Sequence, residues 1–173
     1  VGEERMAKDY LNVIERALMM GISDKINTLT ATGDDIYVFG QFPETEDLKF
    51  PCIVIQQIAS GVQEKFFGEN ITFGSDTSQT GEAYGIGFMI HLMTDRDTKV
   101  TVGSTDYKQR RLLNWLMLNV ANALQDINWD TYEEEDLEIL ERHVLAWNDI
   151  GFMPQVDWYG ASCRMSIVFL NKR

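Results

Sequence analysis

Apolar residues near the start of the chain recur every three or four positions between Glu3 and Met20. This spacing places them on one side of a helix, so the sequence predicts an amphipathic helix over Glu3–Met20. Gly21 follows, and glycine is common just past the end of a helix, so we expect the helix to end there. The predicted apolar side consists of Met6, Tyr10, Val13, Ile14, Ala17 and Leu18.

A longer helical pattern predicts a second helix over Ser104–Ile127. Ser104 is a favourable N-cap residue because its hydroxyl can accept a hydrogen bond from a free backbone N–H. Leu112, Trp115 and Leu118 widen the apolar stripe, which indicates a helix covered on more than one side, by its own sheet and first helix or by another subunit. The stripe itself consists of Leu113, Leu116, Met117, Val120, Leu124 and Ile127.

Short runs rich in branched and aromatic residues predict strands. They lie at Ile36–Phe39, Cys52–Ile55, Ala83–Thr94 and Trp158–Leu170. The last two resemble each other, because Tyr84-Gly85-Ile86-Gly87 in one corresponds to Tyr159-Gly160-Ala161-Ser162 in the other. Glycine inside a strand often marks a bulge or a close backbone approach, so we expect two neighbouring strands with similar bends.

The segment from Gly61 to Gly81 mixes large apolar residues, including Phe66 and Phe67, with glycines and small polar residues. Gly68-Glu69-Asn70 predicts a turn between two strands, and the part after Gly74 predicts a mobile loop. Two interpretations of the segment stay open. It is either a hairpin folded onto its own core or an arm laid on a neighbouring subunit.

From Leu137 to Trp147 the pattern fits a strand or a helix, and the Thr131-x-x-Glu134 spacing is that of a capping box. We favour a strand. The complete order is then helix, strands, long helix, strands. This order predicts a single α+β domain over residues 1–173, in which two helices pack on one face of a mixed or mostly antiparallel sheet and a hairpin or loop protrudes.

The chain carries a net charge of −12, which argues against nucleic-acid binding because such binding needs a basic surface. Between Leu124 and Glu141 there are eight acids and no base, whereas between Asp95 and Arg111 five bases meet three acids. Each run is either a solvated face or one half of a contact between subunits. For the second interpretation, the candidate interface residues are Lys108, Arg110, Arg111, Glu133, Glu134 and Glu135. Phe66 and Phe67 are the candidate interface residues of the possible arm.

No catalytic motif emerges from the sequence. His91 and His143 lack partners at metal-ligand spacing, and Gly85-Ile86-Gly87 continues as a strand where a phosphate loop would open a helix. Asp95-Arg96-Asp97 offers two carboxylates past a strand end, which is a weak indication of a metal site. We therefore expect no enzyme activity, no cofactor and no bound metal.

Two cysteines, Cys52 and Cys163, lie far apart in apolar runs, where free cysteine usually behaves as a small hydrophobic residue. The apolar runs are too short to cross a bilayer, and the N-terminal pattern lacks the core of a signal peptide. We expect reduced thiols in a cytoplasm and no membrane partner.

The order of elements resembles that of the tail terminator, or tail-completion, proteins of long-tailed bacteriophages. The resemblance rests on the predicted helix Glu3–Met20, the run Phe50–Ile55, the run Tyr84–His91, the Arg110-Arg111-Leu112-Leu113 helix and the final strand Tyr159–Phe169. It covers most of the chain and concerns the pattern and order of elements, with extra length at 61–81 and 129–149.

The resemblance implies a structural virion protein, assembled in the host cytoplasm and located in the tail or neck. It implies a hexameric ring that caps the tail tube, stops its polymerisation and joins the tail to the head. The implied partners are further copies of the chain, the tail tube protein and a head–tail connector protein, while DNA passes through without specific binding. Two alternatives stay open, a tail tube or connector subunit and an acidic inhibitor that mimics DNA.

Overall fold

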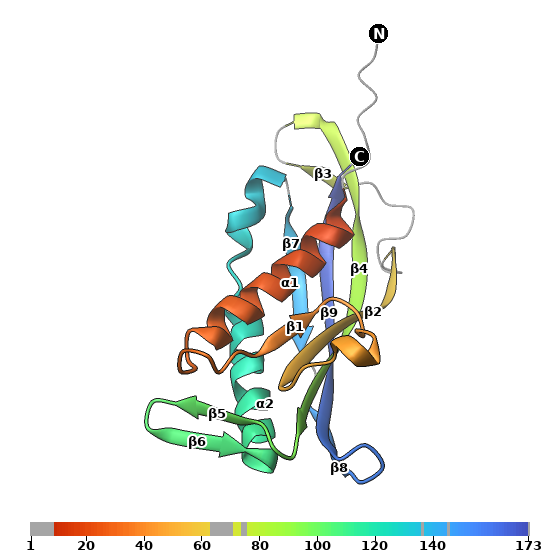
Figure 1. The fold of residues 1–173 in the computed structure, drawn as a ribbon. Coiled ribbons are helices and arrows are strands. Elements are labelled where there is room, and N and C mark those ends of the chain that lie inside the picture. The colour runs from red at the N-terminus through yellow and green to blue at the C-terminus, as the bar shows by residue number, and fades with distance from the viewer. Residues whose placement is uncertain (1–8, 63–70, 74–75, 136, 145, 173) are drawn as a thin grey trace.

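The computed structural model describes residues 9–62, 71–73, 76–135, 137–144 and 146–172. Side chains are described throughout these ranges except at 45, 59, 61–82, 133–135 and 172. The element order is that of an α+β protein (Figure 1).

The main sheet is mixed and mostly antiparallel. Its order is β1 (Tyr37–Phe39), β2 (Cys52–Val62), β4 (Asp76–Asp95), β9 (Trp158–Lys172) and β7 (Ile139–Val144). β3 (Ile71–Phe73) also pairs with β4, and β8 (Asn148–Met153) also pairs with β9. β1 runs parallel to β2, whereas the other described pairs are antiparallel. The predicted α+β fold class is confirmed, whereas the predicted protruding hairpin or loop is not.

Two helices, α1 (Tyr10–Asn27) and α2 (Gln109–Gln125), lie on the same face of this sheet and contact each other (Figure 1). Their apolar sides and one face of the sheet form the main core, in which Phe88 of β4 and Phe169 of β9 are the largest fully buried side chains. Because successive strand residues point to opposite faces, Cys52 and Val54 lie on the other face, in a smaller cluster with Met93. The predicted packing of both helices on one face is confirmed.

α1 does not end at Gly21, so that prediction was wrong. The helix continues to Asn27, and Ile22 and Ile26 are fully buried in its last turns. Gly21 has a packing role instead, because a Cβ atom added there would lie 2.9 Å from Cγ1 of Ile127. The predicted first turns, at residues 3–8, lie outside the described residues.

The second helix begins later than predicted. Residues before Gln109 form a two-stranded hairpin, β5 (Lys99–Val102) and β6 (Thr105–Lys108), and Ser104 lies in its turn, not at a helix N-cap. Gly103 has φ = +60°, which a two-residue hairpin turn requires at its first position. Turn geometry therefore overrides the capping preference of serine.

β4 and β9 are neighbours, as the shared Tyr-Gly pattern predicted. Because they are antiparallel, the two patterns lie at opposite ends of the pair: Gly85 lies opposite Val168, and Gly160 lies opposite Met93. The predicted strand within 137–147 is also confirmed, as β7. Thr131 and Glu134 belong to a short 3-10 helix, η3 (Trp129–Glu135), and do not cap an α-helix.

The segment 61–81 is only partly described. β3 pairs antiparallel with β4, with Thr72 opposite Thr80. The expected mobile loop after Gly74 is a strand from Asp76 onwards, so that prediction was wrong. The predicted turn at 68–70, together with Phe66 and Phe67, lies outside the described residues.

Candidate assembly interface

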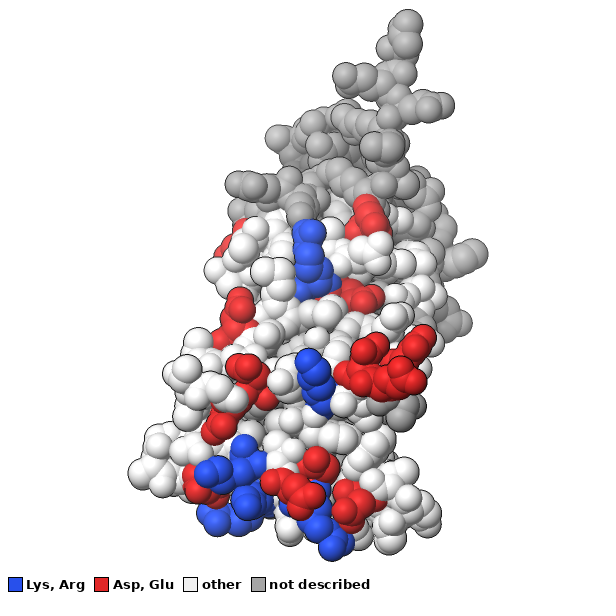
Figure 2. Space-filling model, in the orientation of Figure 1, with Lys and Arg blue, Asp and Glu red and all other residues white. Residues whose placement is uncertain are grey.

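The three basic candidate residues lie where the hairpin passes into α2. Lys108 ends β6, and Arg110 and Arg111 belong to the first turn of α2. All three are exposed. Figure 2 shows Lys and Arg atoms gathered at this lower end of the molecule, with Asp and Glu atoms between them.

Two of these three bases already have partners within the chain. Arg110 forms an ion pair with Asp149 of β8, and the guanidinium carbon of Arg111 lies 5.6 Å from the ring centre of Tyr107. Lys108 forms no ion pair with the described part of the chain, although its charge helps to lower the pKa of Asp106, so among the three it is the base most available to another molecule.

The fold also removes the local excess of bases seen in the sequence. Asp149 forms an ion pair with Arg110. Asp157 lies in the turn before β9, and its Oδ1 is 3.1 Å from Nη2 of Arg96. The five bases of the segment Asp95–Arg111 are thus accompanied by acids from other parts of the chain as well as by its own three. The bases are Arg96, Lys99, Lys108, Arg110 and Arg111, and the acids are Asp95, Asp97, Asp106, Asp149 and Asp157.

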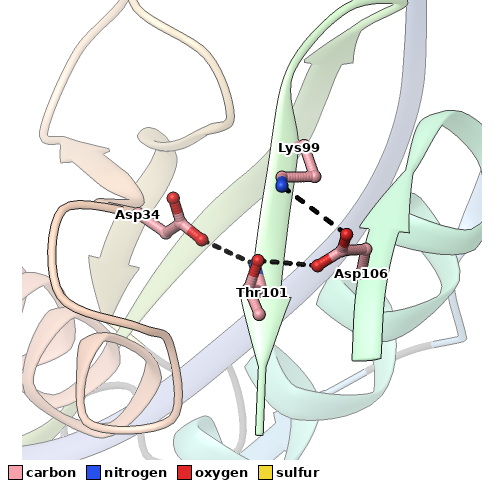
Figure 3. A network of polar contacts seen from close by, with 4 residues as sticks. All are labelled: Asp34, Lys99, Thr101 and Asp106. Carbon is pink, nitrogen blue, oxygen red and sulfur yellow. Dashed lines mark hydrogen bonds and ion pairs between the residues drawn. The ribbon is translucent and has the colours of Figure 1, made fainter. Parts of the chain in front are cut away.

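The hairpin is fixed to the body of the protein through Thr101 of β5 (Figure 3). Its backbone N–H donates to Asp34 Oδ2 at 2.7 Å, and its carbonyl accepts from the N–H of Ala31 at 2.8 Å. Its hydroxyl donates to Asp106 Oδ1 at 2.8 Å, while Lys99 Nζ lies 3.5 Å from Asp106 Oδ2. The hydrogen bond from Thr101, followed by the charge of Lys99, lowers the pKa of Asp106.

The acidic candidates, Glu133, Glu134 and Glu135, belong to η3 beyond the other end of α2. Their side chains lie outside the described part of the structure. The 17 residues of α2 span about 25 Å, so the basic start of this helix and η3 are too far apart to pair within one copy. Figure 1 shows η3, in cyan, at the opposite end of α2 from the β5–β6 hairpin.

A groove of about 430 Å³ lies between η3 and β7. Its lining residues are Ile127, Asn128, Trp129, Asp130, Leu137, Glu138, Ile139, Leu140, Glu141 and Arg142. The indole N–H of Trp129 is buried here and has no hydrogen-bond partner among the described residues. The sequence did not predict this groove. The local patterns of η3 and β7, an acidic turn and a strand, carry no information on the distance between these two elements in space.

His91 and Asp95, considered from the sequence as possible metal ligands, contact neighbouring residues. His91 Nε2 lies 3.2 Å from Gln56 Oε1, its ring lies against Phe42, and burial lowers its pKa. Asp95 Oδ1 accepts a hydrogen bond of 2.7 Å from the N–H of Thr98. Among the described residues, no three His, Cys, Asp or Glu side chains are grouped so that they could hold a metal ion.

Cys52 and Cys163 are free and buried, and burial raises the pKa of each thiol to about 12. Within the described residues, neither helix is long and apolar enough to cross a membrane. Neither a scan against models of protein families nor a search of curated proteins finds a match to this chain.

Proposed function

We propose that this protein is a structural subunit of a phage tail, in which copies join head to tail into a ring that caps the tail tube. The observation that carries the proposal is the position of the two candidate surfaces at opposite ends of α2. A closed ring requires contacts of this heterologous kind, in which two different surfaces of each subunit meet. The order of helices and strands resembles that of tail terminator proteins and supports the same function.

The proposed mechanism is geometric. A closed ring at the tube end leaves no free surface for the next ring of tube subunits, so polymerisation stops. The outer face of the ring then joins the tail to a head–tail connector protein. A net charge of −12 suits a protein beside a DNA channel, because phosphates are repelled by an acidic wall and do not bind to it.

Tail assembly with and without this protein tests the proposal. Without it, we expect tubes of abnormal length that fail to join heads, and addition of the purified protein restores joining. Tubes of normal length that still join heads would refute the terminator role. Native mass spectrometry gives the ring number, for which we propose six, and distinguishes a ring from a monomeric acidic inhibitor.

A further inference from the structure

The groove beside η3 runs along the edge of the sheet and not across one of its faces. Its lining includes every residue from Leu137 to Arg142, although successive residues of a strand point to opposite faces. β7 pairs with β9 on one side, and no described strand pairs with its other side. An open edge presents unpaired backbone N–H and C=O groups and accepts an extended strand readily.

Two details of this edge indicate an incomplete site. The register between β7 and β9 shifts between Ile139 and Glu141, so Leu140 is the extra residue of a bulge and its backbone is left out of the ladder. Its side chain is 41% exposed. Trp129 also lines the groove, and its buried indole N–H lacks an acceptor in the described structure.

The charges of the groove favour a basic occupant. Among its described lining residues, three are acids, Asp130, Glu138 and Glu141, and one is a base, Arg142. Glu138 and Glu141 already take part in contacts within the chain, whereas Asp130 forms no ion pair with the described residues. The chain itself offers an element in β6, which carries one base, Lys108, and one acid, Asp106, whose carboxylate is already bound by Thr101 and Lys99. Within the described residues β6 pairs with β5 alone, and it ends in Lys108, which has no ion pair there. β5 cannot play this part, because Thr101 already binds Ala31 and Asp34 on its outer side.

We propose that the groove between η3 and β7 receives strand β6 of a second copy of this chain. A backbone carbonyl of that strand accepts the hydrogen bond of Trp129, and Lys108 of the second copy lies beside Asp130. This contact rests on the proposed head-to-tail assembly and specifies how its two ends join. The β5–β6 hairpin and the groove lie at opposite ends of α2, so one copy cannot fill its own groove.

Disulfide cross-linking between two single variants tests this contact. Leu140→Cys places a thiol at the groove and Thr105→Cys places one on β6. The native thiols are buried with a pKa of about 12 and so react slowly. When the two variants are mixed under mild oxidation at high concentration, we expect covalent heterodimers. The matched control replaces Leu140→Cys by Leu118→Cys, which lies on α2 at 64% exposure and should give only background.

A charge exchange provides a second test. Lys108→Glu should weaken association about fivefold, which is the effect expected for one exposed ion pair. Adding Asp130→Lys to the same chain should restore association, because each contact then contains the same two charges exchanged. Failure of Asp130→Lys to restore association, or cross-linking no stronger than with the Leu118→Cys control, overturns the proposal.

The tests separate this contact from the proposed function. Rings that form in native mass spectrometry, while the Thr105→Cys and Leu140→Cys variants fail to cross-link and Lys108→Glu has no effect, would reject the contact and leave the terminator role standing. Normal tails in the absence of the protein, together with efficient cross-linking, would reject the terminator role and leave the contact standing.

Discussion

Gly21 lies in the interior of α1, where its missing side chain leaves room for Ile127 just beyond α2. In an open helix, Gly→Ala is favourable by about 1 kcal/mol. Here the new Cβ would lie 2.9 Å from Cγ1 of a branched, buried side chain. Overpacking of this kind costs about 1–3 kcal/mol, so the packing penalty exceeds the gain in helix propensity.

We therefore predict that Gly21→Ala lowers the free energy of unfolding by about 1 kcal/mol, as measured by urea denaturation. The control is the same substitution in an Ile127→Ala background, where the clash is absent and Gly21→Ala should stabilise the protein by about 1 kcal/mol. If Gly21→Ala stabilises the unmodified chain as well, the close approach of Ile127 to α1 does not restrict the side chain at position 21.

Asp106 provides a prediction on pH dependence. Its folded pKa is lowered from 3.8 by the hydroxyl of Thr101 and then by Lys99. The unfolded chain therefore takes up this proton first as the pH falls. Stabilisation by Asp106 is present above pH 3.8 and is lost as the pH falls through the folded pKa.

We expect Asp106→Asn to lower stability at neutral pH and to differ little from the original protein well below pH 3.8. Urea denaturation across this range measures the difference. Asp97→Asn is the matched control, because Asp97 makes no hydrogen bond or ion pair with the described residues and should show no such trend. If the difference in the free energy of unfolding between Asp106→Asn and the original protein stays the same at low pH, the prediction is wrong.

At the scale of elements, the β5–β6 hairpin needs its contacts with the rest of the protein, because an isolated two-stranded hairpin is marginally stable in water. Asp34 supplies one of them, by accepting the N–H of Thr101 at 2.7 Å across 67 positions of sequence. A hydrogen bond to a charged group contributes about 1.5–3 kcal/mol. The loop before β1 therefore sets the position of the hairpin.

Asp34→Ala should lower the free energy of unfolding by about 1.5 kcal/mol and speed hydrogen exchange of the hairpin amides more than that of β4 and β9. The neighbouring Asp35→Ala is the control, since Asp35 is exposed and makes no such contact in the described structure. Equal effects of the two substitutions would show that the hydrogen bond between Thr101 and Asp34 does not hold the hairpin in place.

At the scale of the whole molecule, the hairpin end proposed to meet the groove carries exposed charges that are partly neutralised within each copy. Exposed ion pairs contribute at most about 1 kcal/mol each and are screened by salt. Backbone pairing and apolar contact along β7 should supply most of the affinity between copies.

We predict that raising the salt from low to high concentration weakens association by no more than about tenfold. Analytical ultracentrifugation across a salt series measures it, with the monomeric fold checked by circular dichroism. Complete dissociation at moderate salt would show instead that the charges dominate the contact.

The sequence by itself determined the kinds of element and the fold class. Periodicity is local, and burial of an apolar side requires a partner layer, so two amphipathic helices among β-type runs specify an α+β domain with the helices on one face. The neighbouring arrangement of β4 and β9 also agrees with the prediction from their shared Tyr-Gly pattern, although antiparallel pairing places the two patterns at opposite ends.

The tertiary structure alone decided where elements end and which charges meet. Gly21 and Ser104 are residues of the types that are common at helix boundaries, but neither lies at one. Gly21 lies inside α1 against Ile127, and Ser104 lies in the hairpin turn after Gly103. The groove at Trp129 and the ion pair between Arg110 and Asp149 join segments separated along the chain. Local patterns carry no information on such distances, since these depend on how the two layers pack.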